Sequence, residues 1–340
     1  MPWCNRIEEH QEVIYGYVEI NEQLELQMIT LIRNILAWFL SQLLIHFGFV
    51  SRAKKRALEG EYILSIYFHD PTKAEFESCV KWLIQNKFCF LKDSDLDDIA
   101  QQRVPFPKGA VFLSVDDGWL SNESNIVEVA KKYNVPVTIF VSTEPVETGV
   151  YWWSYLDEAR RLKIKIPKMK VLKRIPDEER IQLVNDIKKK VSMEREAMSI
   201  RQVKRISQVE EITVGGHTHS HPILPNCEDD MAFKELEVSK KKLENWTGRR
   251  IKLFAYPNGD YGVREVELLK KLDYRYGFTN QPNYLTREHF KDPYTIPRFG
   301  FLEGATFAEN ICRMVGLWQP MMRKTTYPFR RNRKNNKRTG

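Results

Sequence analysis

The sequence predicts an α/β fold, a distorted or incomplete (β/α) barrel of the glycoside hydrolase and deacetylase kind with a helical insertion. From residue 61 onward, short β-rich runs alternate with helical patterns, and the connections are too long for hairpins. This alternation favours a mainly parallel sheet. A chain of 340 residues with 42% hydrophobic composition suits one large core with appendages.

The elements follow in order from residue composition and periodicity. Strands are expected at 62–68, 110–115, 135–142, 211–216, 251–257 and 275–279. Helices are expected at 74–87, 122–134, 232–248 and 262–273. The first of these helices places Phe76, Val80 and Leu83 on one face, and Gly248 ends the third. At about 154–208 the pattern loosens into a basic helical insertion, expected to cap one end of the barrel.

Three regions are expected along the chain: an N-terminal segment at 1–58, the barrel domain at 59–315 and a basic tail at 316–340. Residues 321–340 carry eight Lys and Arg and no acid, so they account for the net charge of +8. Such a tail is expected to be solvated, with binding to an anionic surface as the alternative. The nearly neutral remainder argues against a nucleic-acid-binding protein.

The apolar segment 28–50 is interrupted by Arg33, Asn34 and Ser41. It is marginal as a membrane-spanning helix. An interfacial helix anchored by Trp38 and Phe39 is equally compatible, and its basic flank suits anionic headgroups. The third possibility is an amphipathic helix packed on the domain.

Location is predicted from the cysteines and the N-terminus. The five scattered cysteines indicate free thiols in a reducing compartment. The N-terminus lacks a signal-peptide pattern, and the polar stretch from Glu8 to Glu25 suggests a true start at Met28. A cytoplasmic or cytoplasmic-membrane location is expected, with an extracytoplasmic one left open.

The first candidate site is the pair Asp116 and Asp117, in SVDDG, where an apolar strand ends. Barrel active sites lie at such strand ends. Adjacent side chains on an extended backbone point in different directions, so one carboxylate can bind a metal while the other faces substrate. The alternative is an ordinary turn.

The second candidate site is GGHTHSHPIL, which holds His217, His219 and His221. Three of the chain's seven histidines therefore lie within five residues. Imidazoles clustered on a glycine-flanked loop suit zinc, with cobalt, nickel or manganese as alternatives. Two His with one carboxylate leave coordination positions open, as a catalytic metal requires. A structural role is the alternative for any single His.

Two further segments are candidates for substrate contact. In FAYPNG, N–H groups near Tyr256 and Asn258 are candidates for an oxyanion hole, although Pro-Asn-Gly is also an ordinary turn. Tyr151, Trp152 and Trp153 open the insertion, and Trp153 is a candidate for stacking on a sugar ring. Core packing is the alternative for these aromatics.

SVDDG, HTHSH and FAYPNG, in this order, resemble three motifs of the NodB-type polysaccharide deacetylases, carbohydrate esterase family 4. The likeness covers roughly residues 60–303. It implies a distorted (β/α) barrel and a divalent metal held by Asp117, His217 and His221. It also implies Asp116 as general base and Thr218 as an orienting residue. The implied activity is removal of N-acetyl groups from an amino-sugar glycan, or of O-acetyl groups in some branches.

The sequence departs from that family at two positions. An Arg of the third motif is replaced by Ala255, and no His follows His289. We hypothesise that Arg298 takes the place of the missing Arg beside Asp116 and that His69 supplies the acid. A substrate contact or a core position is the alternative for His69. A non-catalytic carbohydrate-binding relative is the alternative for the whole protein.

Overall fold

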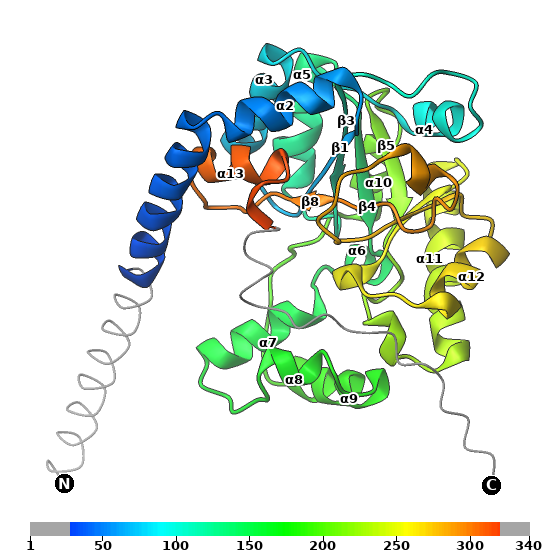
Figure 1. The fold of residues 1–340 in the computed structure, drawn as a ribbon. Coiled ribbons are helices and arrows are strands. Elements are labelled where there is room, and N and C mark those ends of the chain that lie inside the picture. The colour runs from blue at the N-terminus through cyan, green and yellow to red at the C-terminus, as the bar shows by residue number, and fades with distance from the viewer. Residues whose placement is uncertain (1–27, 320–340) are drawn as a thin grey trace, which may run out of the picture.

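A computed structural model describes residues 28–319 (Figure 1). Its centre is an eight-stranded sheet ordered β7-β6-β5-β4-β3-β1-β8, with β2 beside β3, and all neighbouring strands in it run parallel. The strands are β1 (Leu64–Phe68), β2 (Cys89–Phe90), β3 (Ala110–Val115), β4 (Val137–Val141), β5 (Ile212–Gly216), β6 (Leu253–Ala255), β7 (Tyr276–Phe278) and β8 (Phe299–Gly300). The curled parallel sheet confirms the predicted incomplete barrel.

The two edges of this sheet are joined by one irregular segment. Ile296 pairs in parallel with Phe278 of β7, and Phe299 pairs with Ile66 of β1. Residues 296–300 therefore bridge the gap between the first and last strands of the curl. Because only a few bonds make this seam, the barrel is incomplete.

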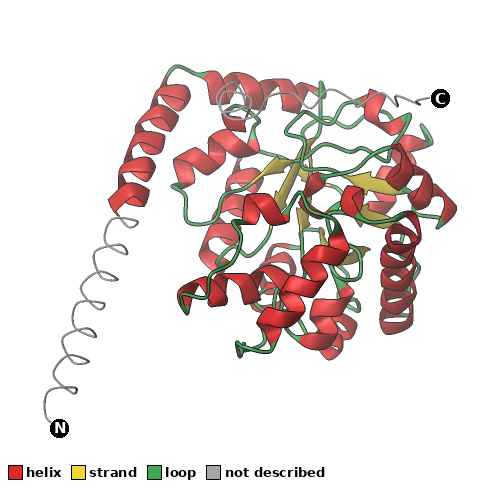
Figure 2. Ribbon diagram, turned by 90° about the horizontal axis from the view of Figure 1, so that it is seen from below, coloured by secondary structure: helices red, strands yellow, loops and turns green. Residues whose placement is uncertain are grey.

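Helices surround the strands (Figure 2). The helix Met28–His46 comes first among the described residues. It is followed by α2 (Phe49–Glu59), α3 (Lys73–Gln85), α4 (Asp93–Ala100), α5 (Glu128–Tyr133), α6 (Thr143–Thr148), α7 (Trp152–Arg161), α8 (Met169–Leu172), α9 (Asp177–Lys188), α10 (Ile200–Ile206), α11 (Asp229–Thr247), α12 (Val263–Lys271) and α13 (Phe307–Met314). Short 3-10 or π turns lie at Glu123–Val127, Leu224–Asn226, Pro257–Gly259 and Arg287–Phe290.

Local chemistry explains several helix boundaries. Thr72 and Glu75 form a reciprocal capping box at the start of α3, which satisfies N–H groups that would otherwise lack partners. Gly248 ends α11 in the left-handed conformation, with φ of 67°, as the sequence indicates. α11 begins at Asp229, three residues earlier than expected.

Alternation along the strands separates two cores. Val111, Leu113 and Val115 of β3 face outward into the core shared with the helices. Phe112 faces inward, where its ring stacks on Phe278 with centroids 5.1 Å apart. Aromatic side chains thus fill the barrel interior and form a floor beneath the carboxyl ends of the strands.

α7, α8 and α9 form a separate helical unit below the barrel in Figure 1, with its own small core around Leu156, Leu172 and Val184. α10, which falls inside the expected insertion, packs on α11 instead. Four cysteines, at 79, 89, 227 and 312, are free thiols, and Cys4 lies outside the described residues. The polar stretch from Glu8 to Glu25 and residues 320–340 of the predicted tail also lie outside them, whereas residues 316–319 are described and Trp318 is buried against the domain.

Candidate metal centre and active site

The candidate residues lie at the carboxyl ends of the parallel strands. Asp116 and Asp117 follow β3. Residues 217–221, which we call the His-rich loop, follow β5. Asp117, Thr218 and His221 all have left-handed backbones, with φ of 76°, 66° and 57°. This conformation is costly for non-glycine residues and is held at functional sites by the surrounding structure. The backbone of these loops therefore adopts conformations of higher free energy that direct the side chains into the site.

Three buried donor groups converge between β3 and the His-rich loop. The Nε2 atoms of His217 and His221 each lie 3.3 Å from Asp117 Oδ1, and the three donors lie within 4.8 Å of one another. His217 Nδ1 lies 2.7 Å from the carbonyl of Ala255, which fixes the proton on Nδ1 and leaves a lone pair on Nε2. Trp119 Nε1 donates to Asp117 Oδ2 at 3.0 Å.

The electrostatics of this cluster fit a cation. Burial disfavours the charge on Asp117, but the neighbouring imidazoles of His217 and His221 hold its pKa well below the usual range. Burial lowers the pKa of His221, which favours the neutral imidazole that binds metals. A carboxylate and two imidazole lone pairs aimed at one point are the donor set expected for a divalent metal with open positions.

Asp116 lies next to this cluster and is bound by Arg298. The guanidinium donates to both carboxylate oxygens at 2.7 Å, and Arg298 is completely buried. Burial alone would raise the pKa of Asp116, but the charge of Arg298 outweighs it and lowers that pKa. The structure thus places Arg298 where the missing Arg was expected, and Asp116 stays ionised.

The same guanidinium holds the barrel seam together. It also donates to Thr279 O at 3.1 Å, to Asn280 Oδ1 at 2.8 Å and to Ser114 Oγ at 2.9 Å. Arg298 therefore connects β3 to the segment after β7. Its position is fixed from three sides.

Glu235 of α11 clamps the His-rich loop, and the sequence gives no sign of this role. Its carboxylate accepts from the backbone N–H of His219 at 2.9 Å and from that of Ser220 at 2.7 Å. It also accepts from Ser220 Oγ at 2.8 Å. His219 Nδ1 lies 2.8 Å from Thr143 Oγ1, so this imidazole bonds away from the metal donors.

Thr218 stabilises the same loop from inside. Its hydroxyl donates to the carbonyl of His217 at 2.5 Å and accepts from the N–H of His221 at 3.1 Å. This link fixes the spacing of the two imidazoles. The orienting role that the resemblance implies for Thr218 has this geometric basis.

An aromatic wall stands beside the metal donors. Trp153 packs edge-on against His221 with centroids 4.6 Å apart, and Tyr151 stacks on Trp153 at 4.7 Å. Trp152 donates to the carbonyl of His221 at 2.9 Å while its ring belongs to the insertion core. The Tyr151 hydroxyl is buried with no hydrogen-bond partner among the described residues. Burial, with a smaller effect of Asp117, raises its pKa well above the usual range.

His69 follows β1 at the same edge. Its ring packs edge-on against Tyr67 with centroids 5.4 Å apart, and its backbone N–H donates to Glu303 at 2.9 Å. It is near enough to lower the pKa of both Asp116 and Asp117. His69 therefore belongs to the site by position.

The third motif corrects one expectation. The backbone N–H of Tyr256 donates to the carbonyl of Phe278 at 3.0 Å, as part of the sheet, so it is not available to an oxyanion. Asn258 lies in a left-handed turn, with φ of 57°, and its side chain accepts from Lys173 Nζ at 2.6 Å. No hydrogen bond from the Asn258 N–H to another described residue is present. Asn258 alone remains the candidate N–H donor in this loop.

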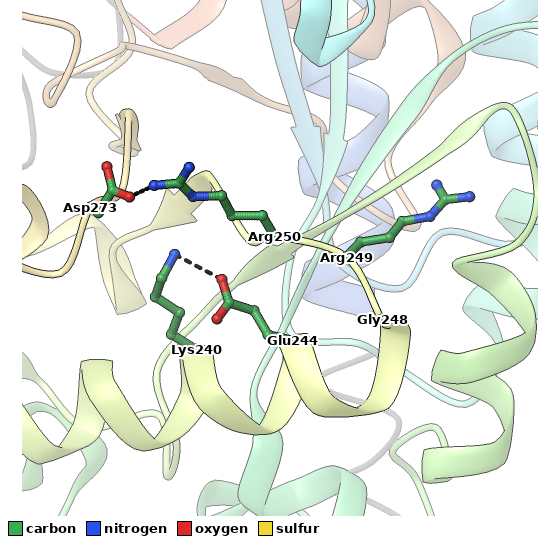
Figure 3. A pocket seen from close by; sticks show the side chains of 6 residues that line it. All are labelled: Lys240, Glu244, Gly248, Arg249, Arg250 and Asp273. Carbon is green, nitrogen blue, oxygen red and sulfur yellow. Dashed lines mark ion pairs between the residues drawn. The ribbon is translucent and has the colours of Figure 1, made fainter.

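A separate surface hollow is shown in Figure 3. It lies near the C-terminal end of α11, beside the chain that enters β6 and β7, which is the opposite edge of the sheet. Two ion pairs lie in it, Lys240 with Glu244 at 3.1 Å and Arg250 with Asp273. It is lined by Lys240, Glu244, Gly248, Arg249, Arg250 and Asp273. None of the candidate site residues is among them.

Comparison with known proteins gives matches across most of the barrel. A family model described as "Polysaccharide deacetylase" matches residues 103–277, more than half of the chain. A protein of Bacillus subtilis (strain 168), "Putative polysaccharide deacetylase YxkH", is 23% identical over 218 residues. The match covers 64% of this chain and 61% of that protein, less than two thirds of its length.

Two solved structures share the fold. The Streptococcus pyogenes deacetylase PplD, in complex with acetate, has a TM-score of 0.54 and 18% identity, over 75% of this chain and 97% of its own. IcaB from Ammonifex degensii also has a TM-score of 0.54 and 18% identity, over 76% of this chain and 97% of its own. At this identity the likeness is one of fold.

Proposed function

Because this chain belongs to the polysaccharide deacetylase family, we propose that it removes N-acetyl groups from an amino-sugar glycan by metal-dependent hydrolysis. The observation that carries the proposal is the ionised Asp116 beside the open cluster of Asp117, His217 and His221. A scaffold that only binds sugar needs no buried carboxylate kept charged by a guanidinium. One solved structure of the same fold is that of a deacetylase in complex with acetate.

Asp117, His217 and His221 would hold a divalent metal, and we propose zinc because one carboxylate and two imidazoles form its usual catalytic donor set. Cobalt, nickel or manganese fit the same donors. When bound, such a cation lowers the pKa of water to about 7 and polarises an acetyl carbonyl.

The protein's own residues then have distinct tasks. Asp116 accepts a proton from the attacking water, and Arg298 keeps that carboxylate ionised and oriented. The N–H of Asn258 faces the developing oxyanion, and Trp153 packs on the sugar ring. His69 donates a proton to the amine as the carbon–nitrogen bond breaks. The balance is one water consumed, with one acetate and one free amine formed.

The test is acetate release from N-acetylated and O-acetylated oligosaccharides, together with the metal content of the protein. We expect wild type to release acetate from N-acetylated substrates and Asp116→Asn to release almost none while keeping its metal. Asp186→Asn, at an exposed Asp of α9 paired only with Lys189, is the matched control and should behave as wild type.

Each other outcome has a definite meaning. Metal retention without acetate release from any substrate by wild type would point to a carbohydrate-binding relative. Release only from O-acetylated substrates would make the protein an esterase. Undiminished release by Asp116→Asn would refute the assignment of the base.

A further inference from the structure

The side of the helix Met28–His46 that faces the protein carries polar residues in its first half and apolar Leu40, Leu44 and Ile45 in its second. Arg33 forms an ion pair with Glu309 of α13, whose side chain is fully buried. Asn34 Nδ2 donates to the carbonyl of Gly304 at 3.4 Å. Ala37 and Ser41 on the same side are buried, and Ala37 packs with α2 and the end of the chain after α13. The polar residues that interrupt the apolar segment are therefore used for docking on the domain.

The opposite side of this helix is apolar and exposed, and we call it the apolar face. The side chain of Leu36 is 65% exposed and that of Phe39 is 57% exposed. No polar side chain lies between them in the sequence. Spacings of three and four residues place such positions on one side of a helix. The apolar face consists of Leu31, Ile32, Leu36, Trp38, Phe39 and Leu43. A helix on the surface of a water-soluble protein normally has polar residues on its outward side and apolar residues on the side facing the core.

Basic residues adjoin the apolar face. α2 starts directly after the two-residue turn that ends the helix, and Arg52 and Lys55 are exposed on it. The Arg52 guanidinium lies 5.9 Å from the ring centre of Phe49. No acidic residue occurs between positions 28 and 58. Lys55 pairs with Glu59 at 3.7 Å and Arg56 with Glu61 at 2.6 Å, so the surface combines exposed apolar side chains with a net excess of positive charge rather than with wholly unpaired cations.

We propose that the apolar face docks on an anionic lipid bilayer, with the helix lying in the membrane interface. Large apolar side chains with a cationic border are the features that bind such interfaces. Among residues 28–319, this is also the single helix that is long and apolar enough to cross a membrane. Crossing would separate Arg33 from Glu309 and place Arg33, Asn34 and Ser41 in hydrocarbon, where polar side chains are costly.

The geometry allows docking without rearrangement of the domain. The packed side and the apolar face are opposite sides of one helix, so lipid contact leaves the ion pair to Glu309 intact. In Figure 1 the helix lies at the margin of the molecule, away from the insertion. A second copy of the chain is the other candidate occupant, but it would bring the same basic residues with it.

The experiment is flotation of the full-length protein with vesicles of phosphatidylcholine alone, or of equal parts phosphatidylcholine and phosphatidylglycerol. Wild type should float with the anionic vesicles, less with neutral ones, and less as salt is raised. Leu36→Glu combined with Phe39→Glu should lower the partition coefficient at least about tenfold. Val263→Glu is the control, because Val263 is a similarly exposed apolar residue on α12, at 81%.

Alkaline carbonate should strip the bound protein from vesicles, as expected for an interfacial helix, and deletion of residues 320–340 should leave binding in place. Resistance to carbonate would overturn the interfacial arrangement in favour of a spanning one. Loss of binding on tail deletion alone, or equal loss with Val263→Glu, would overturn the docking surface. Light scattering without lipid tests the second copy: a dimer that dissociates with the double substitution, and no flotation, would refute the proposal.

Discussion

Replacing Arg298 with Met tests the central ion pair of the site. Met roughly fills the space of the side chain but leaves the Asp116 carboxylate buried without a counter-charge. Breaking a buried pair by removing one partner typically costs about 3–5 kcal/mol. Five hydrogen bonds from the guanidinium are lost as well. We expect a free energy of unfolding lower by at least about 3 kcal/mol, with acetate release abolished.

The difference in unfolding free energy between wild type and Arg298→Met should depend on pH. In wild type the pKa of Asp116 is lowered, so its stabilising contribution is present above the unfolded pKa and is lost only as the pH falls through the folded pKa. In Arg298→Met, the effect of burial is opposed only by the weaker influence of His217 and His69, so the pKa of Asp116 rises and the variant gains stability relative to wild type as the pH falls. The stability gap should therefore narrow between pH 7 and about pH 4.

The assay is urea unfolding of four proteins: wild type, Arg298→Met, Asp116→Asn and the double variant. Because Asn removes the uncompensated charge, the double variant should be more stable than the sum of the single losses predicts, by about 1–3 kcal/mol. Equal m values would show that the unfolded states are comparable. Additive losses, or a gap that does not change with pH, would refute the reasoning about this pair.

Three further predictions concern the same site. His69→Ala should lower kcat for amide substrates by about 10²-fold or more, yet leave aryl esters almost unaffected because their leaving group needs no proton; equal losses on both would remove His69 as the acid. Glu235→Gln should weaken zinc binding by roughly 10–100-fold in calorimetric titration, whereas Glu237→Gln on the same helix should not, because Glu235 alone clamps the His-rich loop. Trp153→Ala should raise KM by roughly twofold to tenfold with a smaller change in kcat, and an unchanged KM would exclude sugar packing there.

Periodicity predicted the long elements of the fold because each has a face to bury. The strand ending before Asp116 is almost wholly apolar, and the helix ending at Gly248 has Ala232, Leu236 and Leu243 at helical spacing on its buried side. β2 and β8 have two residues each, too few for any period to appear. β8, which belongs to the segment that closes the sheet, is defined by its pairing with β1 rather than by its own composition.

The site was predictable to the extent that its chemistry is rare in sequence. Adjacent Asp residues and clustered His residues stand out, whereas Glu235 resembles any acid on the exposed side of a helix. Its burial, 6% exposed, arises only from tertiary packing. The Tyr256 N–H was wrongly assigned to an oxyanion because a turn motif does not reveal that its first amide completes a sheet.

The ion pair between Asp116 and Arg298 also has a consequence for biosynthesis. Its partners lie 182 residues apart in the chain, and the guanidinium belongs to the segment that closes the sheet. A ribosome makes β3 and the His-rich loop long before that segment emerges. Until then the nascent chain contains the base without its counter-ion and a sheet with two open edges. Premature termination before residue 298 would therefore remove the counter-ion and the closing segment together, so the proposed activity requires the chain to extend through this segment.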